Sequence, residues 1–254
     1  MRIIEQSATI LDWSGLDLYE RVEQAARVCR RSEAKGDAEG FVRGLIAKGH
    51  FPPLEFARIK TGLQEGENVR RVREKAAEGS VWNTSLAERL KASYPTLVDD
   101  MDSVREGTDL PKIEPADDWI PVLITTSRTI SHQLVRYRRD ICFMQESQRH
   151  VRYDLDGIEV IEPPGLNQKA WACAEWEHAL EQAENSYINM MRHGATAEQA
   201  RSVLPGCVAT RILAYASPEE WRHIFGQRCD AHADPQMSAL MIPLRDEMLK
   251  RGLI

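Results

Sequence analysis

Six arginines and no lysine lie between residues 128 and 152. The same stretch holds only two acidic residues, Asp140 and Glu146, and two histidines, His132 and His150. In a chain with a net charge of -6, this stretch is a local cationic patch. A guanidinium makes forked hydrogen bonds to phosphate or carboxylate, which a lysine does not. The patch therefore favours recognition of an anion, with a solvated or salt-bridged helix face as the alternative explanation.

Neutral hydrogen-bonding side chains are interleaved with these arginines, namely Gln133, Gln145, Ser147 and Gln148. Arginines beside such groups suit a nucleotide, because the guanidinium groups hold phosphate while the amides read the edge of a base. A second polar cluster, Arg222 to His232 (RHIFGQRCDAH), is weaker evidence. It is open to two interpretations, a binding site or a capped helix end with a surface ion pair.

No motif for a protein nucleophile is present: GxSxG, the P-loop, GxGxxG and HExxH are all missing. Cys142 lies within the cationic patch, but its neighbours Ile141 and Phe143 favour a packing role. The five cysteines form no CxxC pair, so neither a metal site nor a disulfide framework is expected, and a reducing cytoplasm is the expected compartment. The sequence therefore predicts an anion-binding enzyme without an obvious protein nucleophile.

Composition sets the broad class of the protein. The 254 residues are 43% hydrophobic, enough for a substantial core in one large or two small domains, and this excludes a disordered chain. The acidic balance argues against extended nucleic-acid contact. No apolar run approaches the roughly 20 residues that a membrane span requires, and the N-terminus lacks the pattern of a signal peptide.

The elements that must position these groups follow from periodicity and capping. Helices are expected over Asp17–Cys29, Asp37–Lys48, Ser127–Arg138, Ala170–Met191 and Ala197–Leu204, from Pro218 with Ser217 as its cap, and from Asp234 or Pro235 to about Lys250. Strands are expected over Ile120–Thr125 and Ile158–Pro164. A turn is expected over His50–Phe56 and a surface connection over residues 93–118, whereas residues 57–85 have no clear pattern. The result is a helix-rich α+β chain, interpreted as a single domain over residues 1–254.

Two of these helices have a predicted inward face. In the helix predicted over Ser127–Arg138, the residues on the inner side are Ile130, Leu134 and Tyr137. Residues on the inner side of the long helix are Trp176, Ala179, Leu180 and Tyr187. Trp171 and Trp176 are predicted to be core or subunit-interface residues.

The cationic patch resembles the signature of the flavin-dependent thymidylate synthases, an Arg-His-Arg triplet, a short spacer, and a serine followed two residues later by Arg-Tyr. Residues 132–151 read HQLVRYRRDICFMQESQRHV, which places the triplet at residues 136–138 and the serine and arginine at Ser147 and Arg149. Three further blocks agree in order: AARVC at residues 25–29, GHFPPLEF at 49–56, and RSVLP at 201–205 followed by EWRHIFGQRCDAHADPQM. The resemblance covers most of the chain and is weakest over residues 57–118.

This resemblance implies a helix-rich α+β domain with a twisted, mainly antiparallel sheet. It also implies C5-methylation of dUMP to dTMP with methylenetetrahydrofolate as carbon donor and with FAD, reduced by NADPH, as hydride source. No cysteine attacks the pyrimidine in this chemistry, and the protein holds the reactants in register. The family is homotetrameric, with active sites shared between subunits.

Site residues are carried over position by position. Arg149 and Arg201 match the arginines that hold the nucleotide phosphate. Positions that line the nucleotide are matched by Gln133, Gln145 and Ser147, and Ser147 is also a catalytic candidate. Arg228 matches the arginine that faces the pyrimidine carbonyl, where it would stabilise charge developing on the ring. Candidates for contact with the flavin are Arg136, Tyr137, Arg138, His223 and Ser217.

Several positions depart from the family pattern. Tyr137 replaces the triplet histidine, the spacer before Ser147 is one residue longer, and His150 replaces the tyrosine after Arg149. Phe56 replaces the histidine of Leu-Glu-His, and Ser217 with Glu219 stands in place of an Asn-x-Arg element. Three explanations remain open: substitute contacts to the flavin, a specialised UMP or dUMP methylase of a nucleoside-antibiotic pathway, or a non-catalytic nucleotide binder.

Overall fold

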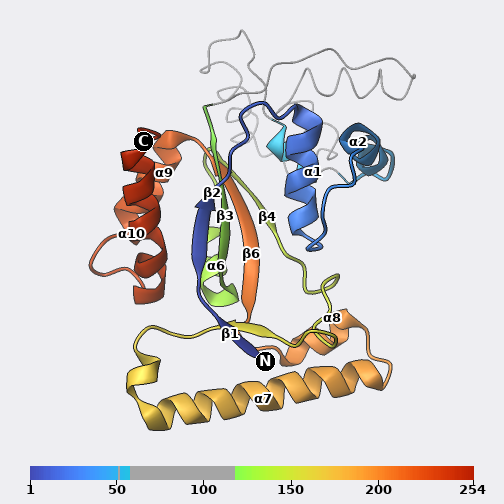
Figure 1. Ribbon diagram of the computed structural model, residues 1–254, viewed down its shortest axis with the longest axis vertical. Helices are drawn as coiled ribbons and strands as arrows, with labels where there is room; N and C mark the ends of the chain where they lie inside the picture. The colour runs from blue at the N-terminus through green and yellow to red at the C-terminus, as the bar shows by residue number, and fades with distance from the viewer. Residues whose placement is uncertain (51, 58–117) are drawn as a thin grey trace, which may run out of the picture.

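A computed structural model describes residues 1–50, 52–57 and 118–254. Its centre is a four-stranded sheet in the order β2-β3-β6-β4, in which every neighbouring pair is antiparallel (Figure 1). The strands of this sheet are β2 (Ser7–Ile10), β3 (Ile120–Ser127), β4 (Ile141–Gln145) and β6 (Ala209–Ala216). The chain is therefore an α+β protein with a mainly antiparallel sheet, as predicted.

Strand β6 shows why helices cover both faces of this sheet. Successive side chains of a strand point to opposite faces, and β6 is apolar on both. On one face Ile212 and Ala214 join a core that includes Trp221, while on the other Leu213 and Tyr215 pack with a second set of aromatic residues. A central strand that is buried on both sides requires a layer on each face.

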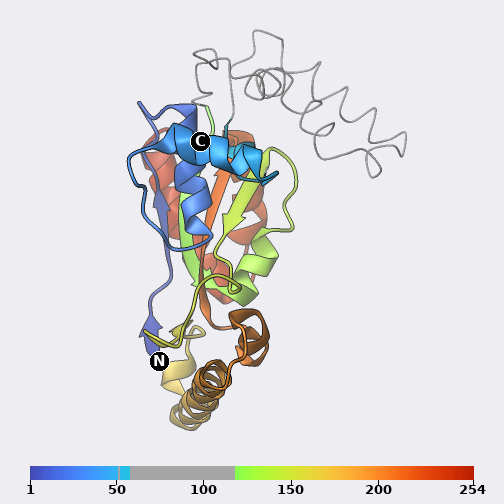
Figure 2. The same ribbon diagram turned by 90° about the vertical axis from the view of Figure 1, so that its right-hand side faces the viewer.

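The two helical layers come from different parts of the chain (Figures 1 and 2). Helices on the face of Ile212 are α6 (Arg128–Leu134), α9 (Pro218–Arg228) and α10 (Pro235–Lys250). Elements on the other side are α1 (Leu18–Val28), the 3-10 turn η1 (Pro52–Phe56), and α2 (Ala38–Ala47), which packs on α1 and η1. The prolyl turn predicted before residue 57 is thus a 3-10 helix within the core.

A second, smaller unit lies at one end of the sheet. Strands β1 (Arg2–Ile4) and β5 (Glu159–Ile161) pair in parallel, and Val160, Leu180 and Tyr187 form its core. The long helix of this unit crosses below the sheet in Figure 1. Its helices and turns are η2 (Leu166–Gln168), α7 (Ala170–Arg192), α8 (Ala197–Ala200) and η3 (Arg201–Val203).

Capping residues explain where the helices begin. Asp17 and Glu20 form a reciprocal capping box at α1, and Asp37 accepts a backbone hydrogen bond at α2. Ser217 caps α9 and Asp234 caps α10, each directly before a proline. These helix starts confirm the predictions made from the sequence.

Four predictions of local structure were wrong in detail. Helix α6 ends at Leu134 rather than Arg138, because the chain turns there and enters β4, so Arg136 and Arg138 lie beyond the helix. Strand β5 ends at Ile161, ahead of two prolines that have no N–H to donate. In α7, Ala179 is exposed, and Trp171 is 79% exposed, so it is not a core residue of this chain, while its alternative role at a subunit interface stays a prediction.

The predictions for residues 58–85 and 93–117 lie outside the described residues, and the single-domain organisation stays a prediction. In the part of the chain that is described, no helix is long and apolar enough to cross a membrane.

Candidate functional site

Arg228, the last residue of α9, lies against the end of α6. Its Nη1 donates to the Oε1 atom of Gln133 at 3.4 Å, and its Nη2 donates to the Gln133 backbone oxygen, also at 3.4 Å. The guanidinium carbon lies 5.3 Å from the centre of the Tyr137 ring, within range of a cation–π interaction. The structure thus brings together two predicted nucleotide residues, Gln133 and Arg228, with one predicted flavin residue, Tyr137.

Tyr137 occupies the position of the triplet histidine and is buried. Its hydroxyl donates to Gln227 at 2.9 Å, and its ring meets that of His223 edge to face, with the centres 5.8 Å apart. Burial raises the pKa of Tyr137, and the positive charge of Arg228 opposes that effect. The tyrosine is therefore a neutral, hydrogen-bonded platform beside Arg228 at physiological pH.

Gln145 ends β4 and is held against the neighbouring elements. Its Nε2 donates to the hydroxyl of Ser131 in α6 at 2.8 Å and to that of Thr210 in β6 at 3.2 Å. Because both amide hydrogens are engaged inside the chain, the side-chain oxygen is the atom left to read a ligand. Gln145 would therefore act as an acceptor.

Arg149 and Arg201 meet at a common carboxylate. Arg149 Nε lies 3.1 Å and Arg201 Nη2 3.7 Å from the same Oε1 atom of Glu198. All three side chains are partly exposed, at 56%, 39% and 51%. The hydroxyl of Ser147 accepts a hydrogen bond from the backbone N–H of Arg149. Two cations that converge on one surface oxygen form a place where a phosphate could replace the carboxylate.

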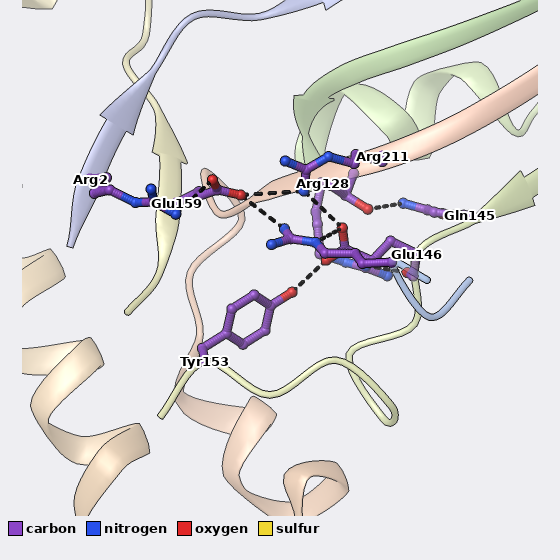
Figure 3. Close-up of polar contacts among 9 residues, drawn as sticks. Arg2, Arg128, Gln145, Glu146, Tyr153, Glu159 and Arg211 are labelled. Atoms are coloured by element: carbon purple, nitrogen blue, oxygen red, sulfur yellow. Dashed lines mark hydrogen bonds and ion pairs between the residues drawn. The ribbon is translucent and has the colours of Figure 1, made fainter. Parts of the chain in front are cut away.

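A buried ion-pair network surrounds Glu146, the residue before Ser147, and was not predicted from the sequence (Figure 3). Glu146 has a fully buried side chain, which accepts from Arg31 Nε at 2.6 Å and from the Tyr153 hydroxyl at 2.7 Å. Arg211 lies 3.5 Å from the same carboxylate, and Arg128 donates to the Glu146 backbone oxygen at 3.4 Å. The network fixes the residue between Gln145 and Ser147.

Glu159 extends this network into the smaller unit. Arg2, Arg31 and Arg211 lie 3.1, 3.1 and 3.3 Å from its carboxylate. Arg31 also adopts a φ of 48°, the one positive value among the described non-glycine residues. No short-range pattern in the sequence indicates these contacts, because the partners come from the turn after α1 and from β1, β5 and β6.

The structure also places three of the predicted flavin contacts and one position that departs from the family pattern. Arg136 and Arg138 are exposed in the turn after α6 and have no hydrogen bond or ion pair with other described residues. Ser217 uses its side chain to cap α9. Phe56, at the family's histidine position, is fully buried and stacks on Tyr215, with the ring centres 6.1 Å apart. That departure from the family pattern is explained by core packing.

The remaining candidates are simpler to place. Cys142 is buried in the sheet core, which confirms its predicted packing role, and His132 is exposed on α6. No group of three or more His, Cys, Asp or Glu side chains that could hold a metal occurs in the described residues. The side chain of Arg228 contacts Gln133 and Tyr137, whereas the side chains of Arg149 and Arg201 contact Glu198, so the described contacts place the three arginines in two groups.

The chain is an α+β protein in which helices cover both faces of an antiparallel sheet and arginines lie near the ends of its strands and helices. The solved structure of the UMP/dUMP methylase PolB from Streptomyces cacaoi, bound with 5-Br dUMP, has this fold: it matches with a TM-score of 0.50 over all of this chain and 93% of that one, at 15% identity. The family model described as thymidylate synthase complementing protein matches residues 120–251. The chain belongs to this family.

Curated relatives agree with this assignment. A flavin-dependent thymidylate synthase of Geobacter sulfurreducens is 33% identical over 118 residues, which cover 46% of this chain and 50% of the relative. One from Pyrococcus furiosus is 28% identical over 127 residues, which cover 49% and 52%. The chain thus spans about half the length of the curated relatives it matches.

Proposed function

We propose that this protein catalyses the flavin-dependent C5-methylation of a uridine monophosphate nucleotide, converting dUMP to dTMP. Methylenetetrahydrofolate would donate the carbon, and NADPH would reduce the cofactor, FAD. Family membership supports the proposal, and so do the names of the relatives. The structural observation that carries it is the convergence of Arg149 and Arg201 on one oxygen of Glu198.

The chain's own residues have distinct tasks in this proposal. Arg149 and Arg201 bind the nucleotide phosphate, and Ser147 lies beside them as a nucleotide contact and catalytic candidate. Gln133 and Gln145 line the base. Arg228 stabilises the negative charge that develops on the pyrimidine ring and makes C5 nucleophilic. No protein nucleophile is required, which agrees with the core position of Cys142.

The residues present fit a flavin dinucleotide. Arg136 and Arg138 are exposed and have no hydrogen bond or ion pair among the described residues. Their guanidinium groups are therefore available to bind the anionic pyrophosphate of the cofactor. The aromatic pair Tyr137 and His223 lies beside Arg228 and offers ring contact. These four residues, with Ser217 at the head of α9, would hold the cofactor. When bound, the flavin would supply the hydride for the methyl group.

Assembly is part of the proposal. By analogy with the family that the sequence resembles, we propose that the active sites are shared between subunits of a homotetramer. We also propose that residues 1–254 form a single domain. The five free cysteines support a location in the reducing cytoplasm.

A parallel turnover assay tests the proposal. Protein reconstituted with FAD is incubated with NADPH, methylenetetrahydrofolate and either dUMP or UMP labelled with tritium at C5. Release of tritium from dUMP is the expected result. Turnover of UMP at an equal or higher rate would favour the specialised methylase. A protein that takes up no FAD and releases no tritium, yet binds either nucleotide, would be a non-catalytic nucleotide binder.

A further inference from the structure

Asp234 divides its two carboxylate oxygens between two tasks. Oδ1 caps α10 by accepting from the backbone N–H groups of Gln236 at 2.9 Å and Met237 at 3.4 Å. Oδ2 accepts from Nε2 of Gln133, 3.1 Å away, on a different element. The residue that begins α10 thus also contacts the end of α6.

This contact decides the orientation of the Gln133 amide. A carboxylate is only an acceptor and a guanidinium is only a donor, so an amide between them has one satisfactory orientation. Its NH₂ group must face Asp234, and its Oε1 must face Nη1 of Arg228, as observed at 3.1 and 3.4 Å. The reverse orientation would place donor against donor on the arginine side.

Arg228 is consequently fixed by two oxygens of a single residue. Its Nη1 and Nη2 donate to the side chain and backbone of Gln133, whereas its Nε is buried and has no partner among the described residues. Buried donors are rarely left unsatisfied in a native protein, and a ligand acceptor would complete this one.

We propose that Asp234 is a positioning residue, which sets the amide orientation of Gln133 and so holds Arg228 ready for the substrate. The inference deepens the proposed function, on which the role of Arg228 toward the pyrimidine rests. In this role Asp234 acts through Gln133 and requires no contact of its own with the substrate.

Asp234→Asn separates this role from helix capping. Asparagine caps a helix about as well as aspartate, so α10 should keep its cap. The new Nδ2, however, would meet the NH₂ group of Gln133. The Gln133 amide would then rotate, turn its NH₂ group toward Arg228, and release the guanidinium. Asp37→Asn is the matched control, because Asp37 caps α2 through Gly40 and has no hydrogen bond or ion pair with a candidate site residue in the described part of the chain.

The first measurement requires no substrate. The Nε–Hε signal of Arg228, identified by its loss in Arg228→Lys, is recorded by ¹H–¹⁵N NMR. We expect it to shift or broaden in Asp234→Asn and to be unchanged in Asp37→Asn. In the double variant Gln133→Glu with Asp234→Asn, the new carboxylate at position 133 can accept hydrogen bonds both from the new asparagine amide and from Arg228. This double variant should restore the signal. An unchanged signal in Asp234→Asn overturns the proposal.

The second measurement uses dUMP. In Asp234→Asn we expect kcat to fall about tenfold and the Kd for dUMP to rise less than about threefold, since a misdirected Arg228 acts mainly on the transition state. An equal loss in Asp37→Asn, or a fall in melting temperature that accounts for the change, would leave Asp234 as a helix cap alone. If the wild-type protein neither binds nor converts dUMP, the proposed function fails, while the NMR result still decides the role of Asp234.

Discussion

Arg31 donates from Nε to Oε2 of Glu146 across 2.6 Å and thereby joins the chain after α1 to the end of β4. The glutamate is buried and the arginine backbone lies in the left-handed region, which a non-glycine residue adopts at a cost. Ser147, the next residue, donates its backbone N–H to Cys29 at 3.0 Å. The segment that carries Ser147 and Arg149 is therefore held to α1 by two long-range contacts.

Replacing Glu146 tests how much this network stabilises the fold. Glu146→Gln removes the more deeply buried of the two carboxylates that face Arg31 and Arg211 and leaves both cations with Glu159 alone. We expect a loss of about 3 kcal/mol in the free energy of unfolding, measured by urea denaturation. Glu247→Gln is the control, since the Glu247–Arg251 pair is exposed and should contribute under about 1 kcal/mol. Equal losses in the two variants would contradict the structural role of the network.

The titration of Tyr153 should make the stability of the fold depend on pH. Burial, followed by the neighbouring charge of Glu146, raises the pKa of Tyr153 above its usual value near 10. A raised pKa in the folded state means that the folded chain retains the proton longer than the unfolded chain. This stabilisation is complete below about pH 10 and is lost as the pH rises toward the folded-state pKa.

Urea denaturation at about pH 8 and about pH 11 measures that effect. The wild type should lose stability between the two values. Tyr153→Phe should lose about 2 kcal/mol at the lower pH, because a hydrogen bond to a charged group is removed, and should show a smaller further loss at the higher pH. An identical pH response in both proteins would show that Tyr153 does not titrate in this range.

Glu198 competes with the proposed phosphate. Glu198→Gln removes the negative charge between Arg149 and Arg201 and should tighten dUMP binding by up to about fivefold, the modest change expected for a partly exposed ion pair. Isothermal titration calorimetry gives the Kd. Arg149→Ala and Arg201→Ala should each weaken binding instead. Weaker binding in Glu198→Gln would mean that the carboxylate positions the arginines and does not compete.

Arg228 should matter more for turnover than for binding. Arg228→Ala removes the proposed stabilisation of ring charge, and a decrease in kcat of about 10²- to 10³-fold is the expected scale for losing one such donor. The Kd for dUMP should change far less. Steady-state kinetics combined with calorimetry separates the two quantities. Parallel losses in kcat and affinity would remove the transition-state role of Arg228.

Local signals were enough to locate most of the described elements. Asp17, Ser217 and Asp234 cap helices where the sequence predicts them, because a cap depends on backbone groups two or three residues away. The strand beginning at Ile120 was equally clear from its apolar, β-rich composition. The end of α6 could not be located from the sequence, because the hydrophobic spacing of Ile130, Leu134 and Tyr137 continues past the point where the chain turns toward β4.

Residue types at short spacing were enough to predict the α+β class, the family and the arginine-rich segment. The folded chain was needed to show which groups meet: Arg149 with Arg201 at Glu198, Arg31 with Glu146, and Asp234 with Gln133. These contacts join residues far apart in the chain. The packing of helices on the two faces of the sheet sets their distances, and no local pattern specifies that packing.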